Sequence, residues 1–205
     1  MTRTAMGNML SGAAAALLLA GGFALSDRAF ATIVAKSAPE SATASSSVTQ
    51  QAAGFAAGEA VIFACRLRNG KQVAVCVARD GQGARFAQYR YGAKGKAPEL
   101  VWPSTPEQGR LSYASAIYSG GGEQQLHFAR GNIGYIMFSR VVRTNFTEGE
   151  PNNPAISDGL VVTRSGRIIA AYACTGADLT PVQTGPAERY IPMADDLFVD
   201  VSELR

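Results

Sequence analysis

The sequence predicts an all-β domain, an antiparallel sandwich or barrel built from consecutive hairpins. Short runs in which apolar and polar residues alternate indicate strands with one buried face. Turn residues separate these runs at intervals of about ten residues, which is typical of sandwiches and barrels. Beyond residue 31, no segment sustains a helical period over three turns. These observations predict the class but leave sandwich and barrel open.

The first hairpin is expected over residues 61–79. The apolar positions that alternate along it are Phe63, Cys65, Leu67, Val73, Val75 and Val77. Asn69-Gly70 is a strong turn signal because both residues tolerate positive φ. The valines that follow favour a returning strand.

This hairpin carries two of the three cysteines of the chain. A four-residue loop would place Cys65 directly opposite Cys76. A two-residue turn would place Cys65 opposite Ala74, with Cys76 diagonal to it on the same face. Either register keeps the sulfurs close, so we expect a Cys65–Cys76 disulfide, which would stabilise the fold by about 3 kcal/mol. Cys174 would then be a free thiol or an intermolecular link.

Further strands follow in order along the chain. Five are expected at Arg85–Tyr91, Leu100–Trp102, Arg110–Tyr118, Gln124–Ala129 and Ile133–Val142. A last hairpin runs from Gly159–Thr163 through Arg164-Ser165-Gly166 into Arg167–Cys174. The run Gly120-Gly121-Gly122 is interpreted as a flexible connection between strands.

Residues 1–31 have the pattern of a signal peptide. Arg3 provides a positive start, Ala13–Leu25 an apolar core, and Ala29-Phe30-Ala31 a cleavage pattern. The apolar run is shorter than the roughly 18 residues that a membrane span needs. We therefore expect export to the periplasm or the cell exterior, with no membrane span once the signal is cleaved.

The rest of the chain divides into a linker and one domain. Residues 32–57 are rich in Ala, Ser and Thr and poor in bulky apolar side chains, which predicts a flexible linker. Residues 58–205 suffice for a single β-rich domain. The net charge is +3, but basic residues gather in 59–96 and acidic ones in 145–205, either compensating within the fold or forming separate patches.

Several local motifs lie along this domain. They are Cys65, Asn69-Gly70-Lys71, Cys76, Tyr89-Arg90-Tyr91-Gly92, Gly95-Lys96, Pro98-Glu99-Leu100-Val101-Trp102-Pro103 and a late strand that ends at Cys174. This pattern resembles a group of exported bacterial β-rich proteins of unassigned function. The resemblance rests on turns, strand faces and cysteines, and it implies an exported β-rich domain without an activity to carry over.

The sequence assigns no catalytic residue. It holds neither G-x-S-x-G nor S-x-x-K, and its single histidine, His127, is expected to be a strand residue rather than a base. A thiol dyad of Cys174 with His127 is a weaker alternative. No zinc site is expected without C-x-x-C, and no nucleotide cofactor, because Gly70-Lys71 and Gly95-Lys96 are not followed by Ser or Thr.

Carboxylates gather towards the last hairpin. Glu148 and Glu150 lie in a loop with Pro and Asn, and Asp158 follows. Such residues could bind calcium, although they lack a regular calcium-loop spacing. They could also serve a hydrolase, but the separation of the carboxylates is a three-dimensional property that the sequence does not give.

One basic and aromatic segment has the character of a binding surface. The candidate binding residues are Arg85, Tyr89, Arg90, Tyr91, Lys94 and Lys96. Arginine and tyrosine together suit anionic or sugar-bearing partners. We therefore expect a non-catalytic exported domain that binds an envelope protein or an anionic glycan. Nucleic acid is excluded by the compartment, and the alternatives are a carboxylate-dependent hydrolase and a structural envelope component.

Overall fold

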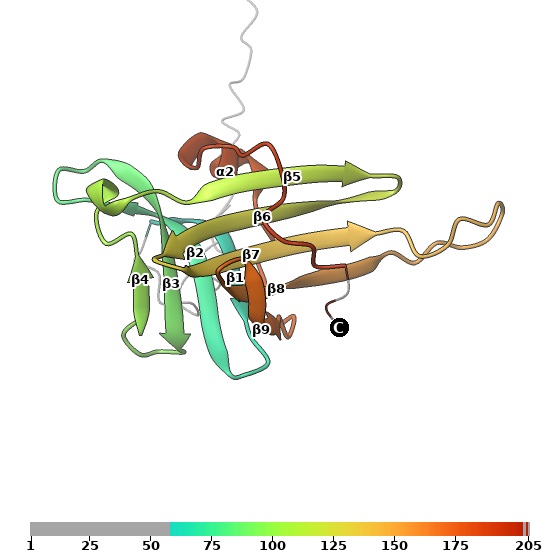
Figure 1. Ribbon diagram of the computed structural model, residues 1–205, viewed down its shortest axis with the longest axis horizontal. Helices are drawn as coiled ribbons and strands as arrows, with labels where there is room; N and C mark the ends of the chain where they lie inside the picture. The colour runs from blue at the N-terminus through green and yellow to red at the C-terminus, as the bar shows by residue number, and fades with distance from the viewer. Residues whose placement is uncertain (1–57, 203, 205) are drawn as a thin grey trace, which may run out of the picture. The chain divides into compact units, whose positions relative to one another are not determined.

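The computed structural model describes residues 58–202 and residue 204, and the prediction of an all-β fold is confirmed (Figure 1). The predicted signal peptide, residues 1–31, and linker, residues 32–57, lie outside the described residues. Two antiparallel sheets form an open sandwich and not a closed barrel. In Figure 1 the strands of one sheet cross those of the other, which is the orthogonal form of sheet packing.

The first sheet has the order β1-β2-β3-β4 and the second β5-β6-β7-β8-β9, so each strand pairs with its neighbour in the chain. The first sheet comprises β1 (Ala60–Arg66), β2 (Lys71–Arg79), β3 (Arg85–Ala93) and β4 (Leu100–Trp102). The second comprises β5 (Ser112–Tyr118), β6 (Gly121–Arg130), β7 (Ile133–Val142), β8 (Ala155–Arg164) and β9 (Arg167–Ala173). A short 3-10 helix, η1 (Pro106–Gln108), precedes β5, and an α-helix, α2 (Thr184–Tyr190), follows β9.

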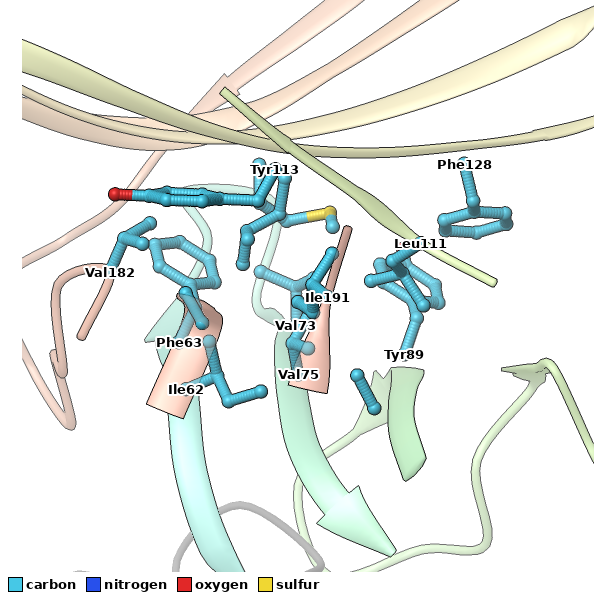
Figure 2. Packing of buried hydrophobic residues seen from close by; sticks show 14 of the residues in the cluster. Ile62, Phe63, Val73, Val75, Tyr89, Leu111, Tyr113, Phe128, Val182 and Ile191 are labelled. Atoms are coloured by element: carbon cyan, nitrogen blue, oxygen red, sulfur yellow. The ribbon is translucent and has the colours of Figure 1, made fainter. Parts of the chain in front are cut away.

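The hydrophobic core lies between the facing sides of the two sheets (Figure 2). Its largest fully buried side chains include Phe63, Tyr89, Tyr113 and Phe128. The Phe128 ring lies 4.8 Å from the Tyr89 ring, centroid to centroid, and 4.6 Å from the Trp102 ring, on which it stacks. Because these rings come from both sheets, their burial holds one sheet against the other.

The chain that follows β9 packs in two places, against the main core and against the outer face of the second sheet. Ala187 of α2 and Ile191 after it join the main core. Residues 194–202, here called the C-terminal strap, lie against the outer face of the second sheet, where Phe198 and Val201 pack in a second apolar cluster. Gln125 of β6 fixes the strap, because its side chain accepts the N–H of Phe198 at 2.8 Å and donates to the Val199 carbonyl at 2.7 Å.

The predicted Cys65–Cys76 disulfide is wrong. Cys65 is bonded to Cys174, and Cys76 is a buried free thiol. The N–H of Leu67 donates to the carbonyl of Lys71 at 2.8 Å, which leaves a three-residue loop instead of two or four. Cys65 therefore lies opposite Val73, and Cys76 points to the other side of the sheet, because a shift of one residue exchanges the two faces.

The interpretation of Gly120-Gly121-Gly122 as a flexible connection is also wrong for two of the three residues. Gly121 and Gly122 belong to β6 and pair with Tyr118 and Ile117 of β5. A Cβ atom at Gly121 would lie 2.0 Å from the Val141 carbonyl oxygen, so the glycine is required by a close backbone contact. Among the described residues, no helix is long and apolar enough to cross a membrane.

Candidate anion-binding site

The six predicted binding residues lie in different environments. Tyr89 is only 1% exposed and belongs to the core. Its buried phenol has a pKa well above the usual value, chiefly because burial disfavours the phenolate. Tyr91 is partly buried against the same core, and its hydroxyl accepts a hydrogen bond from the Asn69 amide at 3.3 Å. These two tyrosines therefore stabilise the fold rather than form an exposed stacking surface.

Arg90 lies on the opposite face of the first sheet. Its guanidinium donates to both carboxylate oxygens of Glu59, at 2.7 and 2.8 Å, in a largely buried pair. Its Nε also donates to Gln88 at 2.9 Å. A bidentate pair of this kind uses much of the donor capacity of the arginine and neutralises its charge.

The two predicted lysines lie in the turn after β3. The Lys94 ammonium forms an ion pair with Asp178 at 2.9 Å, in the segment that follows β9. Lys96 is exposed beside a small slot of about 20 Å³ on the outer face of the first sheet. That volume holds about one water molecule, so the slot does not enclose a larger ligand.

Arg85 lines a larger pocket of about 230 Å³, where three elements of the chain meet. Arg85 begins β3, Arg110 precedes β5, and Arg189 and Tyr190 end α2. The other lining residues are Phe86, Ala87, Pro106, Gly109, Leu111 and Pro192. We call this the arginine pocket.

The local backbone explains how Arg110 reaches the pocket. Gly109 has a φ of 146°, and a Cβ atom there would lie 2.8 Å from the Trp102 ring. Glycine therefore allows the chain to pass tightly over the indole before β5 begins. Leu111, the next residue, is buried in the core, which anchors the segment that presents Arg110.

The electrostatics of the arginine pocket are those of an anion site. All three arginines are exposed, and none forms an ion pair with a carboxylate in the described part of the chain. No aspartate or glutamate lines the pocket. Arg85 donates to the Tyr190 hydroxyl at 3.3 Å, and this hydrogen bond is the main cause of a lowered Tyr190 pKa, to which Arg189 adds. The pocket therefore favours negative charge at the phenol oxygen.

Only Arg85 of this pocket was among the residues predicted from sequence. Arg110, Arg189 and Tyr190 are distant from it in the chain and show no local motif. Their meeting depends on the packing of α2 beside β3. Sequence offers one weak signal, which is that two of the three arginines have an aromatic neighbour, Phe86 and Tyr190.

The residues considered for catalysis are not gathered into one site. Asp158 is buried in β8, where it accepts a hydrogen bond from the Ser139 hydroxyl at 2.5 Å, and burial raises its pKa. Glu148 and Glu150 are exposed in the loop before β8, and neither contacts Asp158 among the described residues. In that same part of the chain, no group of three or more His, Cys, Asp or Glu side chains could hold a metal ion.

The histidine and cysteine of the proposed dyad have other partners. His127 stacks on Phe198 of the C-terminal strap, with ring centroids 4.7 Å apart, and burial lowers its pKa. Cys174 is in the disulfide with Cys65, so it has no thiol with which to form the dyad.

Comparison with known proteins finds no relative. No protein-family model, no curated protein and no solved structure matches this chain.

Proposed function

We propose that this protein is an exported, non-catalytic β-sandwich domain that binds an anionic saccharide of the cell envelope in the arginine pocket. One observation carries the proposal: Arg85, Arg110 and Arg189 line a single hollow whose lining includes no carboxylate. Guanidinium groups donate planar pairs of hydrogen bonds that match carboxylate and sulfate oxygens. Tyr190 adds a hydroxyl and an aromatic edge beside them.

The size of the pocket favours a saccharide over a protein partner. A volume of about 230 Å³ suits one charged sugar unit of a longer chain. Stable protein interfaces commonly cover about 800 Å² on each partner and depend on a buried apolar centre. The arginine pocket offers instead a few exposed donors around a small hollow.

Export is part of the proposal and is supported by two features. The N-terminal sequence has the signal-peptide pattern, and the Cys65–Cys174 disulfide suits an oxidising compartment. An envelope location supplies the ligand class, because acidic polysaccharides occur at cell surfaces.

The test compares binding to polygalacturonate and to its fully methyl-esterified form, which has the same backbone without the charge. The domain is expected to bind only the acidic polymer. Arg110→Ala and Arg189→Ala are each expected to weaken binding about tenfold, corresponding to about 1.4 kcal/mol. Arg164→Ala is the matched control, because Arg164 is an exposed strand-end arginine outside the pocket.

Equal binding to both polymers, or equal losses for the pocket and control variants, would reject the proposal. If the pocket variants instead abolish capture of a protein from an envelope extract while polygalacturonate fails to bind, the partner is a protein.

A further inference from the structure

A second cavity, of about 400 Å³, opens on the opposite side of the second sheet from the core. It lies between the β5–β6 hairpin, the end of β7 and the C-terminal strap. Its lining residues are Tyr118, Ser119, Glu123, Arg140, Val142, Arg143, Phe146, Asp200 and Ser202. None of them lines the arginine pocket, so an inference about this cavity is independent of the proposed function. We call it the strap cavity.

The floor of the strap cavity is a buried polar cluster. Glu123 is 3% exposed and accepts hydrogen bonds from the Tyr118 hydroxyl at 2.8 Å and the Gln125 amide at 2.5 Å. Arg140, directly opposite on β7, approaches the same carboxylate, with its Nε 3.4 Å away. That Nε atom is buried, and among the described residues it has no hydrogen-bond partner.

The rim of the cavity is aromatic on one side and polar on the other. The Arg143 guanidinium lies over the Phe146 ring, 5.0 Å from its centroid, and Phe146 as a residue is 65% exposed. Asp200 and Ser202 of the strap form the polar side. An apolar ring exposed beside convergent polar groups is characteristic of a ligand site.

The charges in the strap cavity oppose one another in equal number. Arg140 and Arg143 are matched by Glu123 and Asp200, so neither a simple anion nor a simple cation is favoured. The lining nevertheless offers many donors and acceptors within a short distance. A ligand with several hydroxyl groups uses both kinds, and its C–H face can stack on an exposed aromatic ring.

We propose that the strap cavity binds a neutral saccharide. The hydroxyls of the sugar hydrogen-bond to Arg140, Asp200 and Ser202, and its apolar face lies on Phe146. This ligand differs in charge from the one proposed for the arginine pocket.

The experiment is calorimetric titration with glucose, galactose, mannose and N-acetylglucosamine, and with the disaccharides of each. At least one is expected to bind saturably and more tightly than the corresponding uronic acid. Phe146→Ala and Asp200→Ala are each expected to weaken that binding at least about tenfold. Both residues are exposed, so neither change should unfold the domain.

Ile117→Ala is the matched control, since Ile117 is an exposed apolar residue of β5 that does not line the cavity. The Arg110→Ala variant should also retain neutral-sugar binding, which separates the two sites. The proposal is overturned if no sugar of the panel binds, or if Phe146→Ala and Asp200→Ala bind as the wild type does.

Discussion

Cys76 shows how strongly the position of one side chain controls its chemistry. The thiol is fully buried, and burial raises its pKa from 9.0 to about 12. Its sulfur lies 3.6 Å from the Gln88 carbonyl oxygen, which suits the protonated thiol as a donor. The residue is therefore a small core side chain without the reactivity of a surface cysteine.

The raised pKa of Cys76 predicts an alkaline loss of stability. Because the folded state holds this proton more tightly than the unfolded state, the contribution is fully present below pH 9.0 and is lost as pH rises towards 12. Urea unfolding from pH 8 upward should therefore show the wild type losing stability faster than Cys76→Ala. The pKa of Tyr89 is also raised, but Tyr89 is present in both proteins. The difference between the two pH profiles therefore reports the Cys76 thiol. Parallel pH profiles would contradict the assignment.

At the scale of elements, the strands follow the sequence pattern closely. All nine predicted strand segments are present among the described residues, because alternation and turn residues act locally. The loop between β1 and β2 shows that alternation and turn residues do not determine the length of a loop. Asn69-Gly70 marks a turn, but its length is set by the hydrogen bond from Leu67 to Lys71, which local propensity does not specify.

The C-terminal strap was not predicted, because it has no regular hydrophobic period. Its place depends on Gln125, which is 0% exposed and forms hydrogen bonds to Phe198 and Val199. A glutamine at a buried strand position is expected to have a polar partner, but the sequence does not identify that partner. Only the packed structure identifies backbone some seventy residues away as that partner.

Gln125→Ala should therefore detach the strap. The change leaves backbone groups of Phe198 and Val199 and the buried Glu123 carboxylate short of partners, which should cost about 3 kcal/mol of unfolding free energy. Hydrogen exchange at the Val199 amide should accelerate. Gln124→Ala is the matched control, because Gln124 is partly exposed and its side chain donates to the Thr184 hydroxyl at 2.6 Å, away from the strap. Equal effects of the two variants would show that the strap is held mainly by its apolar contacts.

At the scale of the whole molecule, the disulfide ties the first sheet to the end of the second. Cys65 is in β1 and Cys174 follows β9, with a sequence separation of 109 residues. Closing a loop of this length restricts the unfolded chain much more than the short predicted loop would. The bridge therefore joins the first and last strands of the sandwich.

Replacing both Cys65 and Cys174 by alanine should lower the free energy of unfolding by about 2–5 kcal/mol. Cys76→Ala should have a smaller effect at neutral pH, since it removes one sulfur and no covalent link. Chemical unfolding of the three proteins tests this, and peptide mapping without reduction should recover Cys65 linked to Cys174. A Cys65–Cys76 peptide would contradict the structure.

The candidate site is the part of the molecule that sequence predicted least. Arg85 was identified, but Tyr89 is a core residue and Arg90 and Lys94 are paired with carboxylates. A basic segment in sequence cannot show which charges the fold neutralises. Arg189 enters the site from α2, a helix too short for a clear periodic signal.

The most direct test of anion binding maps the contact on the intact domain. Nuclear magnetic resonance titration with trigalacturonate should shift signals of the arginine pocket, namely Arg85, Arg110, Arg189 and Tyr190. Added salt should weaken the effect, because the contact depends on charge. Shifts confined to the Lys94–Lys96 turn, or no saturable shift, would contradict the account.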